Sequence, residues 1–418
     1  MRSGKSDCEG RGCSLVSTSI VVEKESVKKT GLIMLLTILS MAAPLSTDMY
    51  LPAIPTMTEV FNTNASILNF TLVGFFFFFG IGMLLFGPLS DKYGRKKILL
   101  TGLFIYAVSS GLCALSISIW QLIIFRILEA LGAGSMVAVS TALVKDLFEG
   151  RNRRVILATI QSLSMLAPIL APIIGAFVIQ YSSWRASFWI LAAIGACCFI
   201  ATLFMKEALP PEERYQGKVL GSLGRLLEVG KNKVFVSLLL IVALQSAVFM
   251  AYIAVSSYIY IDYFNLSETA YSMYFAINAA VLIVGPILSI KLGDKFPISK
   301  IYTTGFSLCL VSGIAVVSFG KLAPIALLLS FIPFSLISSI IRPISINTLL
   351  SQQQSDNGSA ASLINFGFTL LGSIGMVIGT LPWSNFVTGL GILTIISSVL
   401  SLCGWMLFRK SNFEIKGI

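Results

Sequence analysis

The sequence contains no histidine among its 418 residues, and only 12% of them are charged. This excludes zinc sites built on histidine and the commonest proton acceptor at physiological pH. Hydrophobic residues make up 56% of the chain, which leaves too few polar side chains to cover a water-soluble fold. Apolar stretches of spanning length recur along the chain, and in lipid each satisfies its backbone by forming a helix. The composition predicts an all-α polytopic membrane protein in which carboxyl groups carry any proton chemistry.

Cysteine is also sparse, with seven residues and no visible disulfide framework. Cys8 and Cys13 lie in a polar tail, and the others fall inside apolar segments, where cysteine behaves as a small hydrophobic residue: Cys113, Cys197, Cys198, Cys309 and Cys403. We find no metal-ligand cluster, no phosphate-binding glycine loop and no nucleophile with a base. An enzyme is therefore not expected, and neither is a metal or a cofactor.

Hydropathy and turn residues predict twelve membrane-spanning helices. They cover residues 31–50, 66–90, 98–116, 119–144, 155–180, 184–205, 234–261, 269–290, 300–319, 322–348, 359–381 and 386–408.

The formal charge of +11 is explained by where the 30 lysines and arginines lie, so no nucleic-acid partner is expected. Nearly all of them fall in the two tails or in loops on one side of the predicted spans. Only Arg185 and Lys321 fall in loops on the other side, while Arg126 and Arg342 lie within spans. By the positive-inside rule, both termini are expected to be cytoplasmic.

A long polar segment divides the predicted helices into two sets of six. We expect a cytoplasmic tail (1–30), a first six-helix bundle (31–205), a cytoplasmic linker (206–233), a second bundle (234–408) and a short cytoplasmic tail (409–418). Gly87-Pro88-Leu89 is echoed by Gly285-Pro286-Ile287 about 198 residues later, each after the second helix of its half. Two pseudo-symmetric six-helix bundles with a central site are typical of transporters built from repeats.

Two segments carry a resemblance to a known family. Residues 48–55 read DMYLPAIP, and residues 87–97 read GPLSDKYGRKK. The second segment resembles the loop motif of the major facilitator superfamily. The first resembles the D-M-Y-L-P-A-x-P signature of its drug:proton antiporter branch, typified by bicyclomycin and chloramphenicol resistance exporters. The resemblance extends over essentially all twelve spans and implies the major facilitator fold.

The loop motif implies a gate at the cytoplasmic side, made by Gly87, Asp91, Arg95 and Asp146. Gly87 lets a neighbouring helix approach, Asp91 can face a helix N-terminus, and Arg95 is within reach of that carboxylate. An ordinary basic loop without a gating role is the alternative.

Two further motifs lie inside the membrane. Arg126 matches the arginine of the superfamily's helix 4 pattern, with Glu129 in place of the usual glutamine. Pro172 and Gly175 match the helix 5 antiporter motif G-P-x-x-G-G, in which this chain has alanine at two of the three glycines. Alanine also keeps a helix surface smooth for close packing.

Ionisable residues within the membrane are functional candidates by default. At ~1.5 Å per helical residue, Asp48 lies ~24 Å from the cytoplasmic start of its helix, about level with Arg126, and Glu129 lies near the midplane. Arg126 and Glu129 share a helical face and can form a structural ion pair. Alternatively, Arg126 is shared among Asp48, Glu129 and substrate, so that a proton on one carboxylate frees the arginine. Asp48 has its own alternative as a helix-end residue wetted from outside, and Arg342 is interpreted as an anchor at the cytoplasmic boundary.

Aromatic and amide side chains in the helices that the superfamily uses for its cavity are candidates for binding cargo. Such groups suit bulky, weakly polar compounds better than sugars, although packing is the alternative for each residue. They are Tyr50, Gln161, Gln245, Tyr252, Tyr274, Asn278 and Asn365.

The resemblance implies a proton-coupled antiporter that exports drug-like molecules across the bacterial cytoplasmic (inner) membrane by alternating access. Its expected partners are a small-molecule substrate, protons and the lipid bilayer, and we expect a monomer. Two alternatives stay open: an antiporter that exports an endogenous metabolite such as a sugar, amino acid or siderophore, and, more remotely, a passive channel.

Overall fold

The computed structural model describes residues 30–215, 228–352 and 357–410. Most of the N-terminal tail, much of the linker and most of the C-terminal tail therefore lie outside the described residues, as do Cys8 and Cys13. Within the described ranges, eleven helices are long and apolar enough to cross a membrane, and a bent pair at the start of the chain makes a twelfth span. The twelve predicted spans are all found among them.

The helices begin and end within a few residues of the predicted limits, apart from the first span. The elements are α2 (Ala42–Asp48), η1 (Leu51–Ala53), α3 (Ile54–Val60), α4 (Ala65–Tyr93), α5 (Arg95–Ala114), α6 (Ile119–Leu147), α7 (Gly150–Ser164), α8 (Ala167–Tyr181), α9 (Trp184–Leu203), η2 (Pro211–Glu213), α11 (Lys233–Ser257), η3 (Tyr258–Tyr263), α12 (Glu268–Lys295), α13 (Ile298–Phe319), α14 (Pro324–Ser351), α15 (Asn357–Gly379) and α16 (Phe386–Lys410).

Helix 1 is bent and longer than predicted. It consists of residues Thr30–Ser40 followed by Ala42–Val60, with a bend of 48° between them. Pro44 lacks the amide that would bond the carbonyl of Ser40, which accounts for a break at this point. The sequence prediction ended this helix at residue 50. The chain instead passes through the short 3-10 turn η1 and continues as α3.

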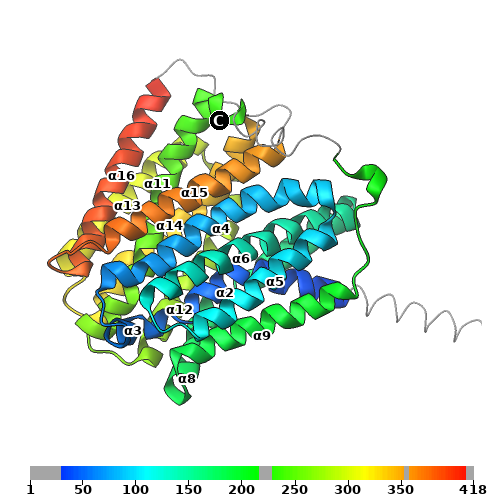
Figure 1. The fold of residues 1–418 in the computed structure, drawn as a ribbon. Helices are drawn as coiled ribbons and strands as arrows, with labels where there is room; N and C mark the ends of the chain where they lie inside the picture. The colour runs from blue at the N-terminus through cyan, green and yellow to red at the C-terminus, as the bar shows by residue number, and fades with distance from the viewer. Residues whose placement is uncertain (1–29, 216–227, 353–356, 411–418) are drawn as a thin grey trace, which may run out of the picture.

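The helices pack as two groups. In Figure 1 the labelled helices α4, α5, α6 and α9 lie side by side in one part of the molecule, and α11, α13, α15 and α16 lie together in another. Contacts between the groups are made by α4 with α15 and by α8 with α12. The end of each group that lies nearest the linker is called the linker end below, and the opposite end is called the far end.

The two groups join at the far end. Ser66, at the start of α4, donates a hydrogen bond to the main-chain oxygen of Thr380 at 2.5 Å, and Ser272 of α12 donates to that of Pro172 at 2.9 Å. One apolar core runs through the first group and into the far end of the second. A second core, at the linker end, is built around Phe235, Phe306 and Trp405; it contains Val229 of the linker and otherwise residues of the second group.

Candidate functional site

Asp48 is the last residue of α2 and lies just before the irregular part of helix 1. Pro52, four residues later, has no amide to bond the carbonyl of Asp48, so regular helix cannot continue here. The carboxyl group is almost fully buried, with 3% of the residue exposed, and accepts a hydrogen bond from the Thr47 hydroxyl at 2.8 Å. The turn η1 that follows packs against α12 of the second group. Asp48 therefore lies beside a contact between the two groups.

The structure corrects one alternative for Asp48. A residue near the end of its helix and wetted from outside would be exposed, but helix 1 continues to Val60 and buries Asp48. The carboxyl group is therefore buried, and helix 1 continues beyond it through η1 and α3.

Arg126 and Glu129 form an ion pair inside the first group. They lie three residues apart on α6, and Nη1 of Arg126 is 2.9 Å from Oε2 of Glu129, with both residues 0% exposed. The same nitrogen donates to the main-chain oxygen of Ser46 at 2.9 Å, which joins α6 to helix 1. The thiol of Cys113 on α5 also donates to Glu129 Oε2, at 3.6 Å.

Three aromatic rings surround the guanidinium of Arg126. Its central carbon lies 4.2 Å from the ring centroid of Phe75, 4.9 Å from that of Tyr50 and 5.7 Å from that of Phe188. Rings stabilise a desolvated cation through their quadrupoles. Three atoms of the pair, Nε and Nη2 of Arg126 and Oε1 of Glu129, have no hydrogen-bond partner among the described residues. Buried polar atoms are usually satisfied, so the pair retains unused hydrogen-bonding capacity.

In the conformation described Arg126 is not shared with Asp48, and sharing of the arginine during transport stays a prediction. Arg126 pairs with Glu129, and none of the four ion pairs among the described residues includes Asp48. Arg126 reaches the backbone two residues before Asp48 rather than its carboxylate. The local ion pair, considered from the sequence as the alternative, is the arrangement present.

The predicted gate residues Asp91, Arg95 and Asp146 do come together at the linker end. Arg95 forms an ion pair with Asp91 one turn earlier, and its Nε lies 2.7 Å from Oδ2 of Asp146 on α6. Its Nη1 donates to the hydroxyl of Ser90 at 2.6 Å. Gly94 permits the tight turn before α5, since its φ of 97° is one that residues with a side chain rarely adopt. All of these residues belong to the first group, so the cluster ties α4, α5 and α6 together.

The structure adds Glu207 to the predicted gate cluster. Its carboxylate lies at the start of α5 and accepts from the amides of Arg95 at 2.9 Å and Lys96 at 3.2 Å. The expectation that Asp91 faces a helix N-terminus stays a prediction. Gly87 was expected to admit a neighbouring helix, yet a Cβ there would meet nothing within 4 Å. Sequence analysis missed Glu207, because it lies more than 100 residues from the start of the helix that it caps.

The helix 5 motif lies between helix 1 and the second group. Gly175 packs so closely on the main-chain oxygen of Met49 that a Cβ would overlap it. Pro172, one turn earlier, accepts the hydrogen bond from Ser272 of α12. The second group repeats the first of these contacts, because a Cβ at Gly375 of α15 would overlap the main-chain oxygen of Ala247 on α11. The paired glycine contacts, about 200 residues apart, add to the internal repeat seen in the sequence.

The seven candidate cargo residues divide by exposure. Gln161 and Asn365 are exposed and Tyr274 is half-buried, stacking on Tyr260 with ring centroids 5.0 Å apart. The other four are buried. Among them, Tyr50 hydrogen-bonds with Thr71 at 2.9 Å, and Gln245 donates to Ser401 at 2.9 Å.

The remaining two buried candidates lie in the second group. Tyr252 is stacked between Phe275 and Phe331. Asn278 keeps an amide oxygen without a partner among the described residues. In this conformation, therefore, Gln161 and Asn365 present their amides at an accessible surface.

Arg342 was predicted to lie at the cytoplasmic boundary of the membrane. Helix α14 continues for nine more residues to Ser351, so Arg342 lies ~13 Å inside that end. At ~100° per residue it is turned ~140° from the exposed Leu329, on the opposite side of the helix. Its guanidinium carbon is 5.3 Å from the ring centroid of Phe368 on α15, and it lines a small pocket with Gln245 and Ser338. Arg342 is exposed beside α15, and its interpretation as an interface anchor stays a prediction.

Comparison with known proteins gives a consistent result. The family model of the Major Facilitator Superfamily matches residues 36–376. An MFS-type transporter of Bacillus subtilis strain 168, YdgK, is 27% identical over 352 residues, which cover 83% of this chain and 88% of the relative. The chloramphenicol resistance protein CraA of Acinetobacter baumannii is 28% identical over 66% of each chain. A chloramphenicol resistance protein of Pseudomonas aeruginosa is 39% identical over 37% of this chain and 38% of its own length.

Solved structures share the fold at low sequence identity. A crystal structure of a D-xylose-proton symporter matches with a TM-score of 0.73 and 15% identity, covering 93% of this chain and 99% of the other. A crystal structure of the human organic anion transporter MFSD10 matches with a TM-score of 0.66 and 17% identity, covering 91% and 99%. The predicted fold, twelve transmembrane helices in two six-helix bundles, is confirmed.

Proposed function

Because the chain belongs to the Major Facilitator Superfamily, we propose that it is a proton-coupled antiporter that exports drug-like molecules across the bacterial cytoplasmic membrane. Relatives named as chloramphenicol, bicyclomycin and multidrug resistance proteins support drugs as the cargo class. The family and fold are those of transporters rather than enzymes.

The mechanism that we propose is alternating access. The hydrogen bonds Ser66–Thr380 and Ser272–Pro172 join the two bundles at the far end, whereas the core at the linker end is formed by the second bundle and Val229 of the linker. Basic residues such as Lys92, Lys96 and Lys97 lie at the linker end, which supports a cytoplasmic location for it. The conformation described is then the inward-facing one. Export requires the far-end contacts to separate while the linker ends approach each other.

Asp48 is the group that we propose binds the coupling proton. Burying an isolated charge is costly, and among the residues that the structure describes Asp48 has only the Thr47 hydroxyl as a hydrogen-bond donor and no cation as a partner. A protonated Asp48 is neutral and can stay buried beside the closed far-end contact. A charged Asp48 favours water, and therefore an open far end. This unpaired, buried carboxyl group next to the contact between the bundles is the observation that carries the proposal.

Arg126 and Glu129 are proposed to transmit this change rather than to bind the proton first. Glu129 already has a cation 2.9 Å away, and Arg126 holds the Ser46 carbonyl of helix 1. A displacement of helix 1 at Asp48 therefore pulls directly on the ion pair.

The cargo is proposed to bind between the bundles and to contact the exposed amides of Gln161 on α7 and Asn365 on α15. These two residues come from opposite bundles, so a molecule that contacts both would respond to their relative position. Amides and nearby rings suit a bulky compound with few polar groups.

The test uses inverted membrane vesicles, in which export concentrates a fluorescent drug inside an acidified lumen. We expect accumulation with the natural chain, its loss when an ionophore collapses the pH gradient, and its loss in Asp48→Asn without collapse. Glu212 is an exposed acidic residue of the linker, so Glu212→Gln is the matched control. Vesicles with this variant should accumulate drug normally. Accumulation by Asp48→Asn that still depends on the gradient would refute the assignment of Asp48. Flux that ignores the gradient altogether would indicate a passive channel.

A further inference from the structure

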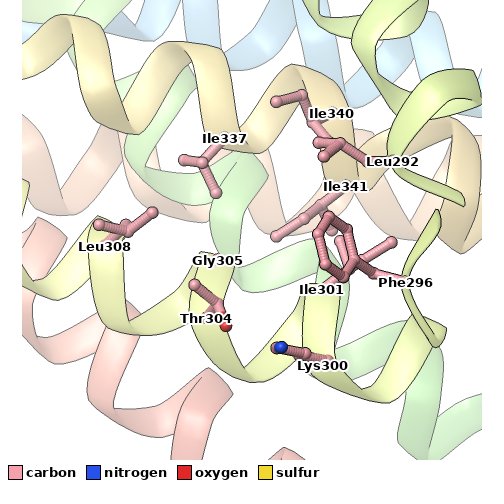
Figure 2. Close-up of a pocket in the computed structure, with 10 residues that line it drawn as sticks. All are labelled: Leu292, Phe296, Lys300, Ile301, Thr304, Gly305, Leu308, Ile337, Ile340 and Ile341. Carbon is pink, nitrogen blue, oxygen red and sulfur yellow. The ribbon is translucent and has the colours of Figure 1, made fainter.

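An apolar groove runs between α12, α13 and α14 at the linker end of the second bundle (Figure 2). Its volume is about 320 Å³. Ile337, Ile340 and Ile341 of α14 form one wall, and Leu308 of α13 lies at one end. At Gly305 α13 packs closely on this wall, since a Cβ there would come within 2.7 Å of Ile341.

The groove lies on the lipid-facing side of the protein. Leu308, Val311 and Ile314 are all exposed and follow each other at intervals of three residues along α13. This spacing places them on one face of the helix, and an exposed apolar face on a membrane span contacts lipid. The groove opens beside this face, since Leu308 belongs to both.

Hydrocarbon fits this groove better than water does. The volume equals roughly ten water molecules at ~30 Å³ each. The lining offers those waters only the Thr304 hydroxyl and the Lys300 ammonium as side-chain partners. Water in such a space would lack the two to four polar partners that it needs.

Lys300 places a positive charge at the groove. Lys300 is the third residue of α13, and Figure 2 shows it on the same side of the groove as Thr304. Its Nζ lies 5.2 Å from the ring centroid of Phe296, and it takes part in none of the four ion pairs among the described residues. Lys291 and Lys295 are exposed on the last turns of α12, with one acidic residue, Asp294, between them. Basic side chains at the end of a membrane span lie at the depth of lipid headgroups.

We propose that this groove is a binding site for an anionic phospholipid, with an acyl chain along the isoleucine wall and the phosphate of the headgroup at Lys300. Apolar surface and charge complementarity lie side by side here, as they do in such a lipid. Basic pockets between spanning helices bind anionic headgroups through the same combination. The site is separate from the proposed cargo residues Gln161 and Asn365, and it does not depend on the direction or coupling of transport.

The test is native mass spectrometry of the purified full chain in mixed micelles with phosphatidylglycerol or phosphatidylcholine carrying identical acyl chains. We expect phosphatidylglycerol to be retained preferentially by the natural chain and its retention to fall roughly fivefold in Lys300→Gln, the effect of about one surface lysine. Lys321→Gln is the matched control, because Lys321 is exposed just beyond the other end of the same helix.

A second variant tests the groove itself. Thr304→Phe places a ring in the groove without changing charge, and it should displace both lipids, while a thermal melt confirms that each variant is folded. Equal retention of the two lipids by the natural chain, or equal losses in Lys300→Gln and Lys321→Gln, would overturn the headgroup assignment. Unchanged retention in a folded Thr304→Phe protein, or displacement of lipid by the fluorescent drug, would overturn the groove as a lipid site.

Discussion

Arg126 donates a hydrogen bond to the main-chain oxygen of Ser46, 2.9 Å away, although the two residues are 80 positions apart in the sequence. The nitrogen that makes this bond is also the one nearest to Glu129. One atom therefore joins the charge pair of α6 to the bent helix that carries Asp48. A change in the charge of Glu129 alters the bond to Ser46, and movement of helix 1 alters the ion pair.

This geometry predicts that breaking the pair is far more damaging than removing it. Arg126→Met leaves the Glu129 carboxylate buried without its cation and should destabilise the protein by about 3–5 kcal/mol. The double variant Arg126→Met with Glu129→Leu should recover most of that loss, because no charge then stays buried. Denaturant unfolding of the three proteins in detergent measures both effects. Additive losses in the double variant would contradict an ion pair that acts as a unit.

A second prediction concerns the close contact of Gly175 with Met49. In Gly175→Ala the new Cβ would overlap a main-chain oxygen, so two helix backbones must separate, at a cost of about 1–3 kcal/mol. Gly375→Ala, which makes the matching overlap with Ala247, should cost a similar amount. Gly87→Ala is the control, because nothing lies within 4 Å of its Cβ, and it should change the melting temperature little. A melting temperature for Gly175→Ala equal to that of Gly87→Ala would argue against the contact.

The sequence was sufficient for the spans because a membrane imposes one rule on every segment, namely that the backbone must bond to itself. The prediction was wrong at the end of helix 1, which was expected at residue 50, whereas the chain continues through a 3-10 turn to Val60. The pair Arg126 and Glu129 was foreseen because their spacing of three residues is local.

Long-range partners were less visible. Glu207 contacts the start of α5 from beyond the end of α9, and Arg342 of α14 contacts Phe368 of the next helix, α15. Neither contact leaves a pattern in the sequence. The gate cluster was found only because the motif resembles that of the superfamily. A polar residue such as Gln245 can contact cargo or pack against another helix, depending on how its own helix is rotated. Hydropathy does not determine that rotation.

A third prediction follows from the position of Arg342. Its guanidinium lies over the Phe368 ring and beside the amide of Gln245, whose oxygen has no partner among the described residues. We propose that Arg342, which is exposed, also contacts acidic cargo. Arg342→Gln should then reduce vesicle accumulation of a carboxylate-bearing fluorescent compound roughly tenfold, because a charge-assisted hydrogen bond is lost. A neutral compound of similar size should be affected less. Arg342→Lys should restore only part of the difference, since lysine keeps the charge but not the planar group that lies over Phe368. Equal losses for both compounds would assign Arg342 to packing.

The far-end contact between Ser66 and Thr380 gives the most direct test of alternating access. The Ser66 hydroxyl lies 2.5 Å from the main-chain oxygen of Thr380, so cysteines at both positions should be close enough for a short thiol cross-linker to join them. Cross-linking should hold the far end closed and stop drug accumulation, and a reducible cross-linker should allow recovery on reduction. Each single cysteine variant, treated identically, controls for modification of native thiols such as Cys197 and Cys403. If the cross-linked double variant still concentrates drug, the two bundles do not need to separate at this end, and rocking about a central site is not how the molecule works.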